Sequence, residues 1–163
     1  MLKLSKPEKK QFNELVKKAR KQKKSLKYIY AGIKNLDLRK HPQYDYYAIV
    51  KDNKYIGLIT LYSSCQSCIL EKCDDPKYSL DYWLLEEYQG KGLGKEALLQ
   101  LINMFPSLGA CTAMDNIRSI KVLESVGFKQ IRTQKYFCSC CYIIDNLPVY
   151  GLHFIYENPL LLH

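Results

Sequence analysis

Residues 84–99 read Leu84-Leu85-Glu86-Glu87-Tyr88-Gln89-Gly90-Lys91-Gly92-Leu93-Gly94-Lys95-Glu96-Ala97-Leu98-Leu99 and decide how the rest of the chain is interpreted. A strand predicted over residues 78–85 ends here, and a helix with an apolar face begins. Three glycines at alternate positions leave backbone N–H groups uncovered at the helix N-terminus, where the helix dipole is positive. Lys91 and Lys95 add positive charge. The stretch therefore predicts a phosphate-binding turn between a strand and a helix.

Two common phosphate-binding motifs do not fit this turn. A P-loop needs Ser or Thr after its Gly-Lys pair, but Glu96 follows Gly94-Lys95, and Gln89 stands at the earlier glycine position. The dinucleotide motif, counted from Gly90, needs a glycine where Lys95 stands. What remains is Gln-x-x-Gly-x-Gly over residues 89–94. Taken alone, such a loop has a plain strand-to-helix turn as its alternative interpretation.

A second strand-to-helix unit follows the first one along the chain. Residues 110–114 are predicted as a buried strand, and a helix is predicted from Asn116 to Val126, with Asp115 or Asn116 as its N-cap. Gly127 ends that helix, and Phe128 opens the next strand. Two such units in succession predict neighbouring parallel strands joined by a right-handed crossover. Both helices then begin at one edge of the sheet, which brings Asn116 and Ser119 beside the glycine-rich turn.

The N-terminal half predicts helices followed by a hairpin. Four apolar residues at helical spacing predict one buried helix face, namely Phe12, Leu15, Val16 and Ala19. A short second helix is predicted around residues 26–35. Two strands are predicted over 46–51 and 54–62, joined by a tight turn at Asp52-Asn53, and a loop over 63–77.

Charge divides the chain of 163 residues into a basic segment and a nearly neutral body. Residues 1–40 hold 14 Lys and Arg against three acids, whereas the rest holds 11 basic and 13 acidic residues. The length fits a single domain. A basic helical segment at 1–40 predicts an acidic protein, ribosome or nucleic acid as partner, with a solvated helix face as the alternative. No apolar run approaches the ~20 residues of a membrane span, so no membrane partner is expected.

The seven cysteines predict free thiols, since their number is odd and no secretory signal precedes them, which favours the cytoplasm. Two groups could form a four-thiolate zinc site, namely Cys65-x-x-Cys68 with Cys73, and Cys138-x-Cys140-Cys141. The predicted topology separates the two groups by a strand length of about 17–20 Å. Buried small side chains are therefore the preferred interpretation, and no metal is expected.

Together these motifs resemble the GNAT superfamily of N-acetyltransferases. The strand Asp81-Tyr82-Trp83-Leu84 and the helix pattern Asn116-x-x-Ser119-x-x-Val122-Leu123-Glu124-x-x-Gly127-Phe128 resemble its ribosomal-protein N-terminal acetyltransferase branch. The resemblance is strong over residues 79–128. It implies an α+β fold over residues 1–163, a single domain with a GNAT-like central mixed β-sheet flanked by helices. It also implies acetyl-coenzyme A (acetyl-CoA) as co-substrate.

The resemblance implies a role for each matching residue. Amides of one run hold the pyrophosphate, namely Gln89, Gly90, Lys91, Gly92, Leu93, Gly94 and Lys95. The backbone of Leu84 and Leu85 pairs with the pantetheine arm, and one of these amides polarises the thioester carbonyl. Asn116 hydrogen-bonds the pantetheine or a water, with a helix cap as the alternative role.

The proton-transfer groups depart from the superfamily pattern. The superfamily's tyrosine acid is replaced by Leu123, and in the ribosomal branch a serine at the place of Ser119 protonates the leaving thiolate. A capping or solvated hydroxyl is the alternative for Ser119. Asp81 is a candidate base for the amine, with a surface strand residue as the alternative.

The expected reaction is direct attack of a neutral amine on the thioester. A protein α-amine has a pKa of about 7.7–8.0 against about 10.4 for lysine, so it needs only a weak base. The lack of an obvious strong base favours a protein α-amine or another amine of low pKa, and the resemblance also implies an N-terminal α-amine. Polyamines, amino acids and antibiotic amines stay open. The alternative function is a catalytically inactive GNAT-fold binding module that uses its basic helix.

Overall fold

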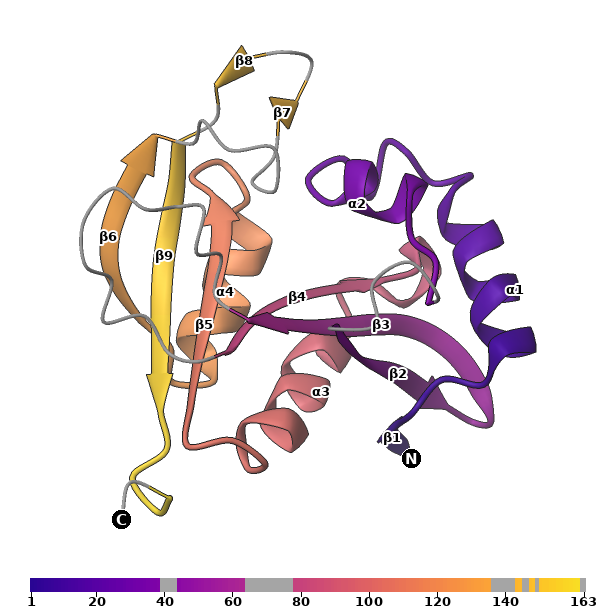
Figure 1. Ribbon diagram of the computed structural model, residues 1–163, viewed down its shortest axis with the longest axis horizontal. Helices are drawn as coiled ribbons and strands as arrows, with labels where there is room; N and C mark the ends of the chain where they lie inside the picture. The colour runs from indigo at the N-terminus through magenta and orange to yellow at the C-terminus, as the bar shows by residue number, and fades with distance from the viewer. Residues whose placement is uncertain (39–43, 64–77, 136–142, 145–146, 149, 162–163) are drawn as a thin grey trace.

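The protein is built on one sheet of seven strands, in the order β1-β2-β3-β4-β5-β9-β6 (Figure 1). The structure is a computed structural model and describes residues 1–38, 44–63, 78–135, 143–144, 147–148 and 150–161. The strands of the sheet are β1 (Leu2–Ser5), β2 (Asp45–Lys51), β3 (Lys54–Ser63), β4 (Tyr78–Leu84), β5 (Ser107–Ala113), β9 (Tyr150–Glu157) and β6 (Lys129–Lys135). A separate pair consists of β7 (Ile143–Ile144) and β8 (Leu147–Pro148).

Helices cover both faces of this sheet. They are α1 (Lys9–Ala19), α2 (Tyr30–Lys34), α3 (Leu93–Ile102), α4 (Ile117–Ser125) and a short 3-10 helix, η1 (Glu86–Tyr88). One core cluster joins the sheet to α3 and α4, and a second joins its other face to α1 and α2. Figure 1 shows α1 and α2 above the strands β2–β4 and α3 below them. The fold is thus the expected single α+β unit with a mixed sheet.

Helix α1 confirms the predicted amphipathic pattern. Its four apolar residues at helical spacing are all buried, with at most 3% of each side chain exposed. Lys17 and Lys18 lie on the opposite, exposed side. The second predicted helix is shorter than the expected range 26–35, because only residues 30–34 are helical and turns precede them.

The hairpin of β2 and β3 is confirmed, including its turn. Asp52 and Asn53 have φ angles of 49° and 60°. Two consecutive left-handed residues form the type of two-residue turn whose twist matches that of paired strands, and Asp and Asn tolerate this conformation well. Strands β2 and β3 then pair antiparallel from Lys51–Lys54 onward. The predicted loop over residues 63–77 lies outside the described residues, apart from Ser63 at the end of β3.

Strands β4 and β5 are the only parallel neighbours in the described sheet, as the two strand-to-helix units predict. They pair at two successive positions only, Ser79 with Gly109 and Leu80 with Ala110. Beyond these positions each strand continues without a partner on this side, and Figure 1 shows the two arrows diverging. The C-terminal parts of both strands therefore separate from each other in the middle of the sheet, and the helices α3 and α4 start near this divergence.

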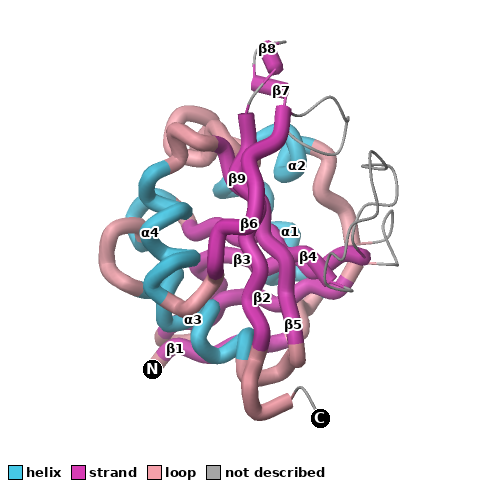
Figure 2. The backbone as a smooth tube through the Cα atoms, turned by 90° about the vertical axis from the view of Figure 1, so that its left-hand side faces the viewer, coloured by secondary structure: helices cyan, strands magenta, loops and turns pink. Residues whose placement is uncertain are grey.

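The sequence analysis missed two strands of the sheet. Strand β9 lies between β5 and β6 and pairs antiparallel with both, so β6 is not a direct neighbour of β5 (Figure 1). Figure 2, turned by 90°, shows α3 and α4 to the left of these strands. Strand β1 adds an antiparallel edge beside β2. The predicted strands rest on the hairpin and the two strand-to-helix units, and both segments lie outside these. None of the helices in the described ranges is long and apolar enough to cross a membrane.

Candidate active site at the divergence of β4 and β5

The glycine-rich turn connects β4 to α3 at the divergence. Gly92 is the N-cap of α3 with φ +74°, and Gly90 has φ +71°. Most residues with a side chain rarely adopt this conformation, so glycine is strongly favoured at both positions. A Cβ atom built at either glycine would meet nothing within 4 Å. The turn therefore exposes open backbone on its outer surface, where a phosphate could approach closely.

Unpaired amides gather at the start of α3. Its first helical hydrogen bond runs from Glu96 N to Gly92 O (3.1 Å). The amides of Leu93, Gly94 and Lys95 precede that bond and have no acceptor inside the helix. Such groups and the helix dipole attract an anion. The free amides and the helix dipole together fit the pyrophosphate of coenzyme A, without an additional binding group.

Two side chains of the turn stabilise the turn itself. Lys91 Nζ donates to Glu87 O (2.6 Å), and Gln89 Nε2 donates to Leu84 O (2.9 Å). The backbone N–H of Gln89 also donates within the turn, to Glu86 O (3.1 Å). Gln89 thus ties the end of β4 to the glycine-rich turn, while Lys95 extends from the exposed surface of α3.

The backbone at the end of β4 offers donors on the side of β5. Leu85 N donates to Ile56 O (2.8 Å), so this amide is engaged with β3. Peptide groups alternate sides along a strand. The N–H groups of Tyr82 and Leu84 therefore point to the other side, where β5 has diverged. Of the two amides expected to meet the pantetheine arm, the structure leaves that of Leu84 available there.

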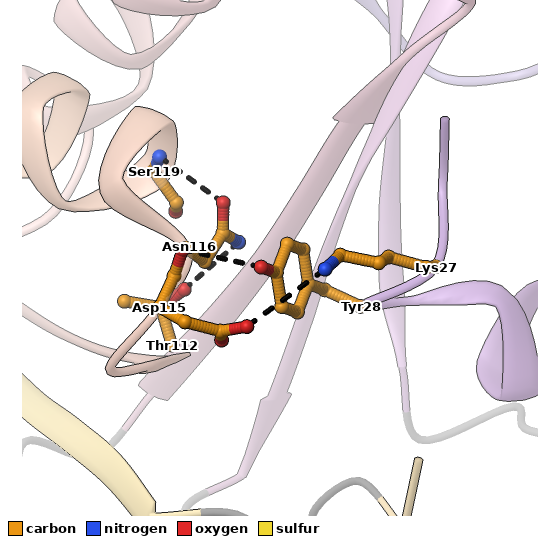
Figure 3. A network of polar contacts seen from close by, with 6 residues as sticks. All are labelled: Lys27, Tyr28, Thr112, Asp115, Asn116 and Ser119. Carbon is orange, nitrogen blue, oxygen red and sulfur yellow. Dashed lines mark hydrogen bonds and ion pairs between the residues drawn. The ribbon is translucent and has the colours of Figure 1, made fainter. Parts of the chain in front are cut away.

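Asn116 is the N-cap of α4 and also ties the helix to β5 (Figure 3). Its Oδ1 accepts from Ser119 N (3.5 Å), and its Nδ2 donates to Oγ1 of the buried Thr112 (3.1 Å). Of the two candidate caps, it is therefore Asn116 rather than Asp115 that caps. An amide side chain has a second hydrogen and a second lone pair, so these bonds leave room for one to a ligand.

Ser119 shares a hydrogen bond with Tyr82, a residue that the sequence analysis treated only as strand-forming. Tyr82 Oη and Ser119 Oγ lie 3.3 Å apart. The Tyr82 ring passes beside Gly94, where an added Cβ would lie 3.4 Å from Cε2. Burial raises the pKa of Tyr82, and the hydrogen bond with Ser119 partly opposes this. The alternation of β4 could have pointed to the pair, since Tyr82 shares the face of Leu84.

Asp81 lies on the opposite face of β4 from Tyr82. It is paired in register with Thr60 of β3, and its neighbour on the same face, Trp83, belongs to the core under α1 and α2. Asp81, the candidate base, and Ser119, the candidate acid beside Tyr82, therefore lie on opposite sides of β4. Leu123, at the position of the superfamily's tyrosine, is only 1% exposed and packs in the core under α3 and α4.

Residues 20–29, the bridging segment between α1 and α2, contact both sides of the divergence. On the β4 side, Gln22 Oε1 accepts from Glu86 N (2.9 Å) and its Nε2 donates to Glu87 Oε2 (3.2 Å). On the β5 side, Tyr28 Oη donates to Asp115 O (3.2 Å) and Lys27 Nζ lies 3.8 Å from Asp115 Oδ2 (Figure 3). No local sequence signal indicates these contacts.

Metal ligands do not gather in the part of the chain that is described. No group of three or more His, Cys, Asp or Glu side chains there could hold an ion. The two cysteine groups weighed as a zinc site, at residues 65–73 and 138–141, lie outside the described residues.

Comparison with known proteins places the fold. A family model described as an acetyltransferase (GNAT) domain matches residues 3–129. Among solved structures, the ribosomal-protein-S5-alanine acetyltransferase from Vibrio fischeri is 18% identical, with a TM-score of 0.71, 97% of this chain and 93% of that chain covered. The microcin C7 self-immunity acetyltransferase in complex with acetyl-CoA and AMP is 15% identical, with a TM-score of 0.73 and 96% and 92% covered.

An aminoglycoside acetyltransferase in complex with coenzyme A is 15% identical, with a TM-score of 0.72 and 97% and 95% covered. At these identities the likeness shows a shared fold. A search of curated protein sequences found no match.

Proposed function

The chain belongs to the acetyltransferase (GNAT) domain family, and we propose that it transfers an acetyl group from acetyl-CoA to an amine by direct attack. One observation carries this proposal. The amides at the start of α3, beside two glycines with open space around them, lie next to the divergence of β4 and β5. A phosphate site and an open strand edge in this arrangement suit a ligand with a pyrophosphate and an extended, amide-containing arm.

The donor would be held by backbone groups. The amides of residues 92–95 would bind the pyrophosphate, and the pantetheine arm would lie along β4 toward β5. The N–H of Leu84 would then point at the thioester carbonyl oxygen. An N–H fixed in this position stabilises the negative charge that develops on that oxygen during attack.

The amine would approach from the α1 and α2 face, where Asp81 lies. The nitrogen forms a bond to the carbonyl carbon, and its excess proton passes to Asp81 or to water. When the C–S bond breaks, its electron pair stays on sulfur, which takes a proton from Ser119 Oγ. A weak base such as Asp81 suits a protein α-amine better than a lysine amine, because the α-amine has a pKa of about 7.7–8.0 and is partly neutral at pH 7.

The basic segment supports an acidic acceptor. Lys17, Lys18, Lys21, Lys23 and Lys24 are all exposed. The last three belong to the bridging segment, whose Gln22 and Tyr28 contact the two sides of the divergence. Their positive charge therefore lies on the side from which an acceptor would approach. We infer that the acceptor is the N-terminus of a polypeptide with acidic residues close to its α-amine.

Donor binding is tested with the full chain and coenzyme A by calorimetry. Gly92→Val should abolish binding, because a branched side chain is strained at φ +74° and obstructs the phosphate. Gly32→Val is the matched control, since Gly32 also has open space around it but no positive φ. Unchanged affinity of folded Gly92→Val would contradict the loop assignment.

Turnover is tested with acetyl-CoA and a panel of amines, by measuring the release of free thiol. Peptides with an acidic N-terminal sequence should be acetylated faster than neutral or basic peptides of equal length. Tight coenzyme A binding without turnover of any amine would instead favour the inactive binding module.

A further inference from the structure

We propose that Tyr82 acts through Ser119 as the second member of a proton-donating hydroxyl pair. In this pair Tyr82 positions the Ser119 hydroxyl toward the sulfur and restores its proton. The inference rests on the proposed acetyl transfer and adds Tyr82 to it as a positioning residue.

Rigid elements hold both hydroxyl groups. Tyr82 belongs to β4, and its side chain reaches across to α4, where its Oη lies 3.3 Å from Ser119 Oγ. The absence of a side chain at Gly94 makes room for the ring, which would be 3.4 Å from a Cβ there. Helix α4 is fixed in turn by Asn116, which bonds Ser119 N and Thr112. The contact thus joins two elements whose positions are already determined.

The direction of the hydrogen bond decides what Ser119 can do. A serine hydroxyl has one hydrogen to donate and two lone pairs that accept. If Tyr82 donates to Ser119 Oγ, the serine hydrogen is directed away from the phenol. A phenol with its ordinary pKa of about 10 is protonated at neutral pH, and burial raises the pKa of Tyr82 further, so the phenol can serve as that donor. The serine hydrogen is then available to the leaving sulfur.

The protons and electrons balance without a further reactant. As the C–S bond breaks, sulfur keeps the electron pair and takes the Ser119 proton, and Ser119 Oγ takes the Tyr82 proton. Tyr82 recovers a proton from water after the products leave. A phenol has a reference pKa of about 10 and a thiol of about 8.5. With these reference values, proton transfer from the phenol to the thiolate is unfavourable by only ~1.5 pKa units. An isolated serine hydroxyl is a much weaker acid than a phenol, so the pair makes the step easier.

The pair also explains how the site can do without the superfamily's tyrosine, whose position is occupied by Leu123. That position carries the superfamily's tyrosine, whereas here it is a buried leucine in the core. Tyr82 supplies a phenol from β4 instead, and it reaches the same helix, α4, at Ser119. A phenol is therefore retained at the site although it comes from another element.

The test compares Tyr82→Phe, Ser119→Ala, Ser119→Thr and the double variant Tyr82→Phe/Ser119→Ala by steady-state kinetics in H₂O and D₂O. Tyr82→Phe should lower kcat by about 10- to 100-fold, at or below the lower end of general acid effects, because Tyr82 acts through Ser119, and leave KM for acetyl-CoA nearly unchanged. The solvent isotope effect on kcat should shrink. The double variant should be no slower than Ser119→Ala, while Ser119→Thr should retain most of the activity. Tyr55→Phe is the control, because its hydroxyl accepts from Glu8 N, whereas that of Tyr82 bonds Ser119.

Two results would overturn the pair. Parent-like kcat and isotope effect in Tyr82→Phe would show that the phenol is not used, and fully multiplicative effects in the double variant would show that Tyr82 does not act through Ser119. Circular dichroism checks folding. If Tyr82→Phe fails to fold, Ser119→Ala provides the test: it should lose the solvent isotope effect on kcat, and an unchanged isotope effect would overturn the pair. An active parent with an unaffected Tyr82→Phe overturns the pair alone, whereas a parent without turnover overturns the proposed function and the pair together.

Discussion

Tyr46 places a phenolic hydroxyl in the core under α1 without satisfying it. The residue is 6% exposed, and its Oη has no hydrogen-bond partner among the residues that the structure describes. Its ring packs edge-on against Phe12, with the ring centres 6.0 Å apart. Burial, followed by the nearby Tyr44 and Asp37, raises the pKa of Tyr46 to about 12. Because this hydroxyl loses its contact with water on folding and gains no hydrogen bond in return, it lowers the stability of the folded chain.

Tyr46→Phe should therefore raise the free energy of unfolding at pH 7 by about 1 kcal/mol, measured by urea denaturation. In the parent, the unfolded chain loses the phenolic proton near pH 10 while the folded chain retains it until about pH 12. Stability is thus lost as pH rises through this window, and the variant should lose less. Tyr55→Phe gives up an existing bond to Glu8 N and should be slightly destabilised. Equal destabilisation of both variants would contradict the role given to Tyr46.

At the scale of elements, the bridging segment determines the geometry on the acceptor side. Gln22 alone makes two hydrogen bonds to η1, one to Glu86 N and one to Glu87 Oε2. Because η1 directly precedes the glycine-rich turn, the same side chain links the acceptor side to the donor side. The links to Asp115 are made at the other end of the segment, by Lys27 and Tyr28.

Gln22→Ala should release one end of the bridging segment and raise KM for the acceptor by roughly 3- to 10-fold, which corresponds to about one hydrogen bond. Affinity for coenzyme A should change less, since the amides of α3 stay in place. Gln11→Ala, at an exposed position of α1, is the matched control. Steady-state kinetics and calorimetry separate the two effects. If KM for the acceptor stayed constant while donor affinity fell, the segment would belong to the donor side.

Elements with a local signal could be predicted from the sequence, and contacts between distant segments could not. The glycine-rich turn, the Asn116 cap and the hairpin turn at Asp52-Asn53 are each specified by a few consecutive residues. The contact between Tyr82 and Ser119 spans 37 positions, and that between Gln22 and Glu86 spans 64. Such contacts depend on how the sheet brings elements together. The insertion of β9 between β5 and β6 was missed for the same reason.

For the molecule as a whole, the uneven charge predicts a dependence on salt. Residues 1–40 are strongly basic, whereas the rest of the chain is nearly neutral. Exposed charges attract an acidic partner over a distance that salt limits to about 10 Å at 0.1 M. The basic segment should thus matter most when the ionic strength is low.

Replacing Lys21, Lys23 and Lys24 by Gln should lower kcat/KM for an acidic peptide, with the largest loss at low salt, and leave coenzyme A affinity intact. Replacing Lys54, Lys121 and Lys129, which are exposed on other elements, removes the same net charge and should have a smaller effect. Kinetics over a salt series measure both. Equal losses from the two triple variants would mean that net charge matters and its position does not.

The two-pair contact between β4 and β5 leaves an unfinished ladder inside the protein. An unpaired strand edge usually invites another chain, and most sheets cover it or pair it. Here the edge lies in the middle of the sheet, with α3 and α4 packed on one face and α1 and α2 on the other. A pantetheine arm, which carries amides of its own, would complete the ladder by strand addition. The co-substrate would then act as a temporary part of the secondary structure, and a thioester without such an arm would leave the sheet incomplete.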